Sequence, residues 1–199
     1  VGGEYVMAAD LAGFADVKVA NTSRLKRLDQ SVMPIVKLHG DDQWWVRSVD
    51  IGRWGPKETA KRIVDHMGDQ KLDIQTFGME RGTIFNAVVP YLNDEAGHKD
   101  RKPPVGLKLQ PLSHENKSKI DRVTWALVGR LEHGRIKFRR GPWMTEVEDQ
   151  LVNFPSRLVH DDVPDALAYI AQIAEGRRFS MFSDSMEDYW KPMDEDVGF

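Results

Sequence analysis

The sequence contains no cysteine, and this absence excludes several classes of protein at once. Disulfide frameworks, thiol catalysis and the zinc and iron–sulfur sites that use cysteine all need that residue. The sequence also has no apolar run near the roughly 20 residues that cross a bilayer, and its start shows no basic segment followed by an apolar stretch. We therefore expect neither a membrane protein nor a secreted precursor.

The sequence has no large excess of either charge: it contains 28 Lys and Arg residues and 31 Asp and Glu residues, for a net charge of −3. The acids are concentrated at the end, where six acids and one base lie between Asp184 and the C-terminus. The rest is slightly basic, with clusters at 24–27, 99–102, 117–122 and 135–140. A solvated surface is the commoner reason for any one such cluster, so charge alone does not identify a nucleic-acid-binding protein.

Strand and helix patterns alternate along what we expect to be one domain, residues 1–179, followed by an acidic, flexible tail at 180–199. Gly40-Asp41-Asp42 joins two β-rich runs, which predicts a hairpin. Strands interleaved with helices, together with this hairpin, predict an α/β fold with a mixed sheet. The predicted strands are 5–9, 33–39, 43–51, 72–77, 105–109 and 136–138, and the predicted helices are 56–68, 84–92, 118–134, 145–151 and 161–174, with a loop at 99–104.

Acidic residues occur at the ends of these elements, where ordinary surface placement does not explain them. Asp10 and Glu80 each follow a predicted strand, and Asp162 and Asp165 lie one helical turn apart at the start of an apolar helix. Asp161 or Asp162 alone is explained equally well as a helix cap, whereas a buried Asp165 needs a partner or a metal ion. Carboxylate oxygens suit Mg²⁺, and a pair of such ions promotes phosphodiester cleavage.

Three motifs carry a resemblance to a known family: Ala9-Asp10-Leu11-Ala12, Gly78-Met79-Glu80 and His160-Asp-Asp-Val-Pro-Asp-Ala-Leu-Ala168. Together they resemble the C-terminal nuclease domain of the large terminase subunit of tailed double-stranded DNA bacteriophages. The order Asp, Glu, Asp-x-x-Asp also resembles RuvC-type resolvases, which share the RNase H-like fold. The resemblance extends over residues 5–174 and implies a mixed RNase H-like sheet flanked by helices.

The resemblance implies a metal-dependent endonuclease that cuts concatemeric viral double-stranded DNA during genome packaging in the host-cell cytoplasm. Asp10 would bridge two Mg²⁺ or Mn²⁺ ions, Glu80 would bind one of them, and Asp165, then Asp162, would complete the site. The implied partners are double-stranded DNA, the portal protein, the small terminase subunit and the ATPase domain of the same polypeptide. No Gly-x-x-x-x-Gly-Lys-Ser/Thr loop occurs, so the ATPase domain is absent from this chain. Two alternatives are a RuvC-like junction resolvase and a non-catalytic module that docks on the portal or the small terminase subunit.

Five basic residues are candidates for DNA contacts; a solvated surface explains Lys117, Lys119 and Arg122 equally well and is the favoured explanation for Arg139 and Arg140. Lys117, Lys119 and Arg122 open a predicted helix whose start should share the sheet edge with the acids. Arg139 and Arg140 end the basic cluster at 135–140. These five residues are therefore tentative DNA-binding residues.

His160 and the Trp44–Trp45 pair each have a functional and a structural interpretation. His160 could assist a metal-bound water or hold a phosphate, but a hydrogen bond at the start of the helix is the commoner role. Trp44 and Trp45 are neighbours on one strand and so face opposite sides of the sheet. At most one belongs to the core on a given side, and we expect the other to stack on a base or, as we favour, to pack beneath a neighbouring loop.

Overall fold

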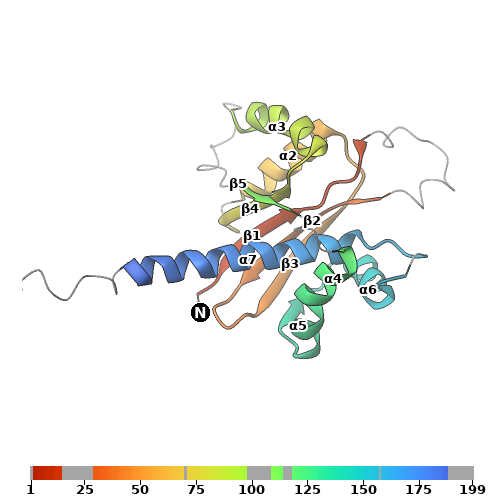
Figure 1. Ribbon diagram of the computed structural model, residues 1–199. Coiled ribbons are helices and arrows are strands. Elements are labelled where there is room, and N and C mark those ends of the chain that lie inside the picture. Colours follow the sequence, from red (N-terminus) through yellow and green to blue (C-terminus); the bar gives the residue numbers. More distant parts are fainter. Residues whose placement is uncertain are drawn as a thin grey trace, which may run out of the picture.

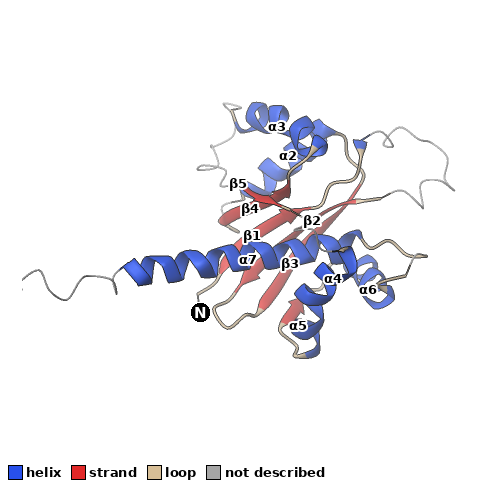
Figure 2. Cartoon of the chain, viewed as in Figure 1, coloured by secondary structure: helices blue, strands red, loops and turns tan. Residues whose placement is uncertain are grey.

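The computed structural model describes residues 2–14, 29–69, 71–97, 109–113, 118–156 and 158–187. Its centre is a six-stranded sheet with the strand order β5-β4-β1-β2-β3-β6 (Figures 1 and 2). The strands are β1 (Glu4–Ala9), β2 (Ser31–Leu38), β3 (Trp44–Gly52), β4 (Ile74–Glu80), β5 (Leu109–Leu112) and β6 (Ile136–Phe138). The helices are α2 (Pro56–Met67), α3 (Thr83–Ala96), α4 (Lys119–Val123), the π-helical η2 (Thr124–Val128), α5 (Gly129–Glu132), α6 (Met144–Asn153) and α7 (Asp162–Glu187).

The sheet is mixed, as the sequence predicts. Strand β2 pairs antiparallel with both β1 and β3, which confirms the hairpin. Strands β4, β5 and β6 are added in parallel, β4 beside β1, β5 beside β4 and β6 beside β3. Each parallel addition requires a crossover, and the helices of the chain supply these connections.

Helices lie on both faces of the sheet and create two cores. Helix α7 crosses one face, where it packs with α4, η2 and α6, and helices α2 and α3 lie on the other face (Figure 1). Strand β1 serves both cores, because Val6 and Ala8 face α7 while Met7 and Ala9 face α2 and α3. All four side chains are fully buried, which confirms β1 as a central strand that delivers Asp10 at its end.

Ile120, Val123, Leu127 and Leu131 recur at helical spacing, which predicts one buried face for this helix, and the segment 119–132 departs in part from that pattern. Val123 and Leu127 are buried as expected, but Ile120 is 51% exposed and Leu131 is 38% exposed. The buried position near the start of the segment is taken by Arg122 instead. A π-helical turn holds more residues than an α-helical turn, so the 3.6-residue period behind the prediction does not continue through η2.

Helix α7 is buried around its circumference as predicted, yet it is longer than predicted. Almost every side chain from Val163 to Ile173 is buried. The helix continues to Glu187, so residues 180–187, which the sequence analysis assigned to the tail, are helical. Once packing has ordered the first turns, each added residue needs little further stabilisation to remain helical. Residues 188–199 lie outside the described part of the chain.

Two other predictions differ in position. Strand β5 occupies Leu109–Leu112, whereas the predicted strand covers 105–109, of which 105–108 lie outside the described residues together with the predicted loop at 99–104. Strand β4 extends through Glu80 itself, whereas the predicted strand ends at residue 77.

Among the helices within the described ranges, none is long and apolar enough to cross a membrane.

Candidate active site

Asp10 and Glu80 lie at the same edge of the sheet because the strands that precede them are parallel neighbours. The register pairs Ala9 of β1 with Met79 of β4, so the next residue of each chain segment is one of the two acids. Asp10 is held by two backbone hydrogen bonds with Val32 of β2, with N–O distances of 3.0 and 2.8 Å. The backbone position of Asp10 is therefore set by strands on both sides.

Helix α7 reaches this edge because a glycine lets it approach β4 closely. A Cβ atom at Gly78 would lie 2.7 Å from Cδ1 of Ile173 and 2.9 Å from Cδ1 of Leu112, so both side chains would have to shift to make room for it. With glycine there, the Tyr169 hydroxyl donates a hydrogen bond to Oε2 of Glu80 over 3.0 Å. The first turns of α7 therefore bring Asp162 and Asp165, each 5% exposed, toward the edge that carries Asp10 and Glu80.

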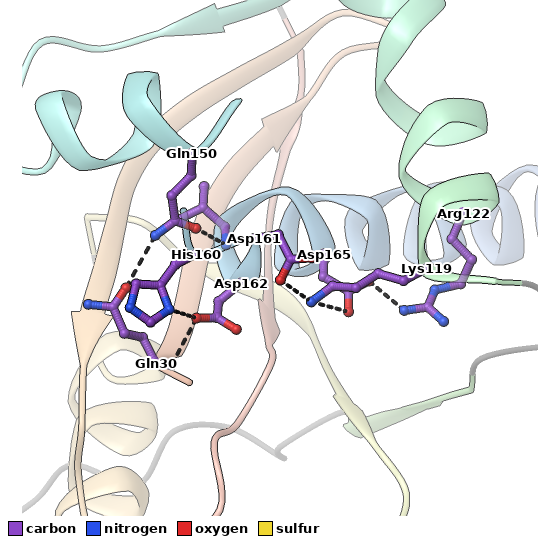
Figure 3. A network of polar contacts seen from close by, with 9 residues as sticks. Gln30, Lys119, Arg122, Gln150, His160, Asp161, Asp162 and Asp165 are labelled. Carbon is purple, nitrogen blue, oxygen red and sulfur yellow. Dashed lines mark hydrogen bonds and ion pairs between the residues drawn. The ribbon is translucent and has the colours of Figure 1, made fainter. Parts of the chain in front are cut away.

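Two basic side chains of α4 meet the acids of α7 (Figure 3). Arg122 donates from Nη2 to Oδ1 of Asp165 over 2.5 Å, and only 7% of Arg122 is exposed. Nζ of Lys119 lies 2.7 Å from Oδ1 of Asp161 and 3.6 Å from Oδ2 of Asp165. Asp165 thus has a cation beside each carboxylate oxygen, which offsets the loss of hydration on burial.

Asp162 contacts a different set of residues, Gln30 and His160, as Figure 3 shows. Its Oδ2 accepts a hydrogen bond from the backbone N–H of Gln30 over 2.9 Å and lies 3.5 Å from Nδ1 of His160. His160 therefore lies beside the start of the helix, next to Asp162, and its role stays a prediction. Gln150 completes the arrangement, since its Oε1 accepts from the N–H of Val163 over 2.8 Å and its Nε2 donates to Oε1 of Gln30 over 3.2 Å.

Gln30 and Gln150 belong to this site although no pattern in the sequence points to them. Gln150 is 1% exposed in α6 and lies 120 positions from Gln30. Isolated glutamines are common on helix surfaces, so no local pattern marks either residue. Only the packing of α6 against α7 reveals that Gln150 fixes the start of the helix that carries Asp162 and Asp165.

The carboxylates at the edge act on one another electrostatically. Burial, followed by the charge of Asp165, raises the pKa of Asp10 from 3.8 to about 8, with smaller contributions from Asp162 and Glu80 and an opposing one from Lys119. Burial also raises the pKa of Asp162, although the Gln30 N–H and Lys119 oppose it. Negative charge is therefore crowded at this edge.

Two groups beside the carboxylates respond to that charge. The pKa of the Tyr169 hydroxyl is raised by burial first and then by Asp10, so the phenol remains a hydrogen-bond donor. Burial would lower the pKa of Lys119, but the hydrogen bond to Asp161 and the charge of Asp165 outweigh it and raise that pKa. Lys119 is therefore a charged cation beside the acids.

The donor set fits a hard divalent cation, although the ligands are not gathered around one point. Within the described part of the chain, no three His, Asp or Glu residues lie close enough together to hold a metal ion. Burial and the charges of neighbouring carboxylates raise the pKa of Asp10, and carboxylate oxygens are nonetheless the ligands that Mg²⁺ and Mn²⁺ prefer. Asp10, Glu80 and Asp165 would hold the metal, and Lys119 would have to move aside.

A pocket of about 230 Å³ opens beside these strand ends. It lies between the ends of β1 and β4 and the start of α3, and Glu80 is part of its wall. The lining residues are Ala9, Leu11, Met79, Glu80, Arg81, Gly82, Thr83, Ile84 and Phe85. Glu80 therefore lies between the polar contacts with α7 and a hollow on the α3 side.

The tentative DNA-binding residues do not gather at one place. Arg122 is buried against Asp165, and Lys119 is paired with Asp161. Arg139 and Arg140 are exposed after β6, the edge strand that lies three strands away from β1. Lys117 lies outside the described residues.

Comparison with known proteins identifies the fold. No family model and no curated protein matches the sequence. The fold is RNase H-like, and solved structures of large terminase nucleases match it, in line with the resemblance of the motifs.

The matching structures cover most of the chain. The large terminase nuclease of thermophilic phage G20c with bound magnesium aligns with a TM-score of 0.56 and 15% identity, covering 85% of this chain and 81% of that one. The same nuclease with bound zinc gives a TM-score of 0.54 and 17% identity, with 84% and 79% covered. The Thermus phage P74-26 large terminase nuclease domain gives 0.54 and 16%, with 84% and 77% covered. At these identities the likeness establishes the fold.

Proposed function

We propose that this chain is a divalent-metal-dependent DNA endonuclease that cuts concatemeric viral double-stranded DNA during genome packaging. The observation that carries the proposal is the placement of Asp10, Glu80 and Asp165 from β1, β4 and α7 at one sheet edge, where burial and the charges of the other two raise the pKa of Asp10. The fold likeness to large terminase nucleases, one of them with bound magnesium, supports it.

Each residue of the site has a role in this proposal. Asp10, Glu80 and Asp165, with Asp162 as a further ligand, would hold two Mg²⁺ or Mn²⁺ ions, and Asp10 would be shared by both. When bound, such ions activate a water molecule and stabilise the leaving oxygen of the phosphodiester.

The chain itself supplies the orientation of these ligands. The Tyr169 hydroxyl holds one oxygen of Glu80, and Arg122 holds one oxygen of Asp165. Lys119 neutralises the same carboxylate before metal binds. In the cell, by the same proposal, the chain works in the host cytoplasm with the portal protein, the small terminase subunit and an ATPase domain of the same polypeptide.

Cleavage of supercoiled plasmid by the purified chain tests the proposal. We expect nicking and linearisation with Mg²⁺ or Mn²⁺, none with chelator, and none from Asp10→Ala, Glu80→Ala or Asp165→Ala. Asp94→Ala is the matched control, because Asp94 is an exposed acid on α3. Cutting by the Asp165→Ala protein at the wild-type rate would remove Asp165 from the site. Absence of metal-dependent cutting by the folded wild-type chain would refute the proposal, and preference for a four-way junction over linear duplex would replace it with junction resolution.

A further inference from the structure

Four neighbouring strands carry a row of alternating aromatic and basic side chains, Tyr5, Lys37, Trp45 and Lys137, here called the basic–aromatic row. The register pairs Tyr5 with Lys37, Lys37 with Trp45 and Trp45 with Lys137. Residues directly opposite each other on adjacent strands project to the same face of the sheet. The row therefore runs across β1, β2, β3 and β6 on one face.

The side chains of the row contact one another as cations and rings. Nζ of Lys37 lies 5.5 Å from the centre of the Tyr5 ring, and Nζ of Lys137 lies 5.7 Å from that of Trp45. The ring of His39 lies 4.8 Å from the Trp45 ring. Trp45 nevertheless remains 47% exposed, while its neighbour Trp44 is 1% exposed in the core on the opposite face. The prediction that the second tryptophan packs beneath a neighbouring loop is therefore wrong for Trp45, which is half exposed.

The row lies on the α2 face but at the end of the hairpin that α2 does not reach. Helix α2 meets β3 near its other end, where Arg62 and His66 pair with Asp50 at 3.1 Å. Tyr5 precedes Asp10 by five residues on β1, which corresponds to about 17 Å along the strand. The row is therefore separate from the candidate active site.

The charge of the two lysines and the exposed ring of Trp45 together favour one class of ligand. An apolar partner would strip water from the Lys37 and Lys137 ammonium groups without replacing its hydrogen bonds. A nucleic acid strand offers phosphates to these groups and bases to Trp45, and base–aromatic stacking needs unpaired bases. The exposed Arg139 follows Lys137 on the same edge segment and adds positive charge. Asp41, on the hairpin turn, is an acid of the same hairpin, and its carboxylate accepts a hydrogen bond from Gln43 over 2.7 Å. The charges of the row itself are positive, which favours a nucleic acid strand as the ligand.

We propose that the basic–aromatic row is a binding site for single-stranded DNA, with Trp45 stacking on a base and Lys37 and Lys137 contacting phosphates. This inference rests on the proposed function in one respect only, namely that the bound strand is DNA and not RNA. Such a site would hold an unpaired segment about 17 Å or more from the edge where the duplex is cut.

Binding of a fluorescently labelled 15-nucleotide oligothymidine to the full chain, followed by anisotropy in chelator, tests the inference. Loss of one stacked base weakens binding by roughly 5- to 150-fold, so we expect Trp45→Ala to weaken it about tenfold or more and Trp45→Phe to stay within about threefold. Replacing Lys37 and Lys137 with Gln together should reduce the slope of log affinity against log salt by about 1.4. Trp125→Ala is the matched control, because Trp125 is 52% exposed on η2, and its affinity should equal that of the wild type.

Each contrary result overturns the inference. Wild-type chain that does not bind the oligonucleotide, or Trp45→Ala protein that is folded by circular dichroism and binds within twofold of wild type, would refute it. Equal losses from Trp45→Ala and Trp125→Ala would show a non-specific effect. Tighter binding of a blunt duplex would exclude a single strand as the ligand, and tighter binding of oligouridine would exclude DNA. Chelator prevents metal-dependent cutting, so the anisotropy assay measures binding alone. A negative result in it therefore refutes the single-strand site without bearing on the proposed endonuclease, which the plasmid assay tests.

Discussion

Removing Arg122 should destabilise the chain more than most single substitutions, because it would leave Asp165 buried beside one cation instead of two. The side chains of Arg122 and Asp165 are 8% and 7% exposed and form a hydrogen-bonded ion pair. Arg122→Leu preserves the apolar packing of the stem while deleting the charge. It also deletes Nε, a buried donor with no hydrogen-bond partner among the described residues.

The magnitude follows from what remains around Asp165. Breaking a buried ion pair by removing one partner costs roughly 3–5 kcal/mol. Nζ of Lys119 stays 3.6 Å from the other carboxylate oxygen, so we expect the lower end, about 3 kcal/mol. With an unfolding entropy of roughly 2.1 cal/mol/K for each of the 199 residues, this lowers Tm by about 7 °C.

A double-mutant cycle separates the ion pair from other effects of the substitution. In the Arg122→Leu, Asp165→Asn protein neither charge remains, so its loss of stability should be smaller than the sum of the two single losses by about 2 kcal/mol. Urea unfolding of the four proteins, followed by circular dichroism in chelator, measures this coupling.

The control for this cycle is an exposed ion pair. Lys61 and Asp65 are 50% and 49% exposed, so Lys61→Leu should change stability by no more than about 0.5 kcal/mol. A coupling energy below about 1 kcal/mol between positions 122 and 165 would refute the reasoning, because it would mean that Lys119 alone satisfies Asp165.

Three further predictions concern other positions. Because burial and nearby carboxylates raise the pKa of Asp10 from 3.8 to about 8, its contribution to folding is present below pH 3.8 and is lost as pH rises through about 8. Asp10→Asn should therefore flatten the fall in unfolding free energy between pH 4 and 9 in chelator; an unchanged pH profile would contradict this. Gly78→Ala should cost about 1–3 kcal/mol in urea unfolding, since its Cβ would crowd Ile173 and Leu112, and a neutral effect would show that these two side chains move aside without cost. The hydrogen bond from His66 lowers the pKa of Asp50, so this carboxylate stabilises the fold above pH 3.8 and ceases to do so as pH falls through its folded value. Thermal melts from pH 6 to 2 should show a weaker acid dependence for Asp50→Asn than for the wild type.

Local patterns were enough to predict the elements that position the acids. The continuous apolar run of β1, the turn between β2 and β3 and the apolar helix after Asp162 each express a short-range preference. The order of Asp10, Glu80 and Asp165 along the chain, together with the motifs around them, indicated the RNase H-like fold that the comparison with solved structures shows. Their individual roles in catalysis stay predictions.

Patterns of this kind failed where a side chain acts over a long sequence distance. Arg122 lies 43 positions from Asp165, and Gln30 lies 132 positions from Asp162. Arg122 lies two positions after Ile120, so an α-helical period places it off the predicted apolar face, and the η2 turn changes the helix face beyond it. The buried pair therefore could not be read from the period of the apolar residues.

The sequence by itself determined which residues are apolar enough to form the sheet and which acids follow its strands, because both depend on neighbouring residues. Only the tertiary structure decided that Lys119 and Arg122 face Asp165 and that Trp45 stands exposed in a row with Lys37 and Lys137. The physical reason is that strand register and the close approach of α7 at Gly78 arise from packing between segments far apart in the chain.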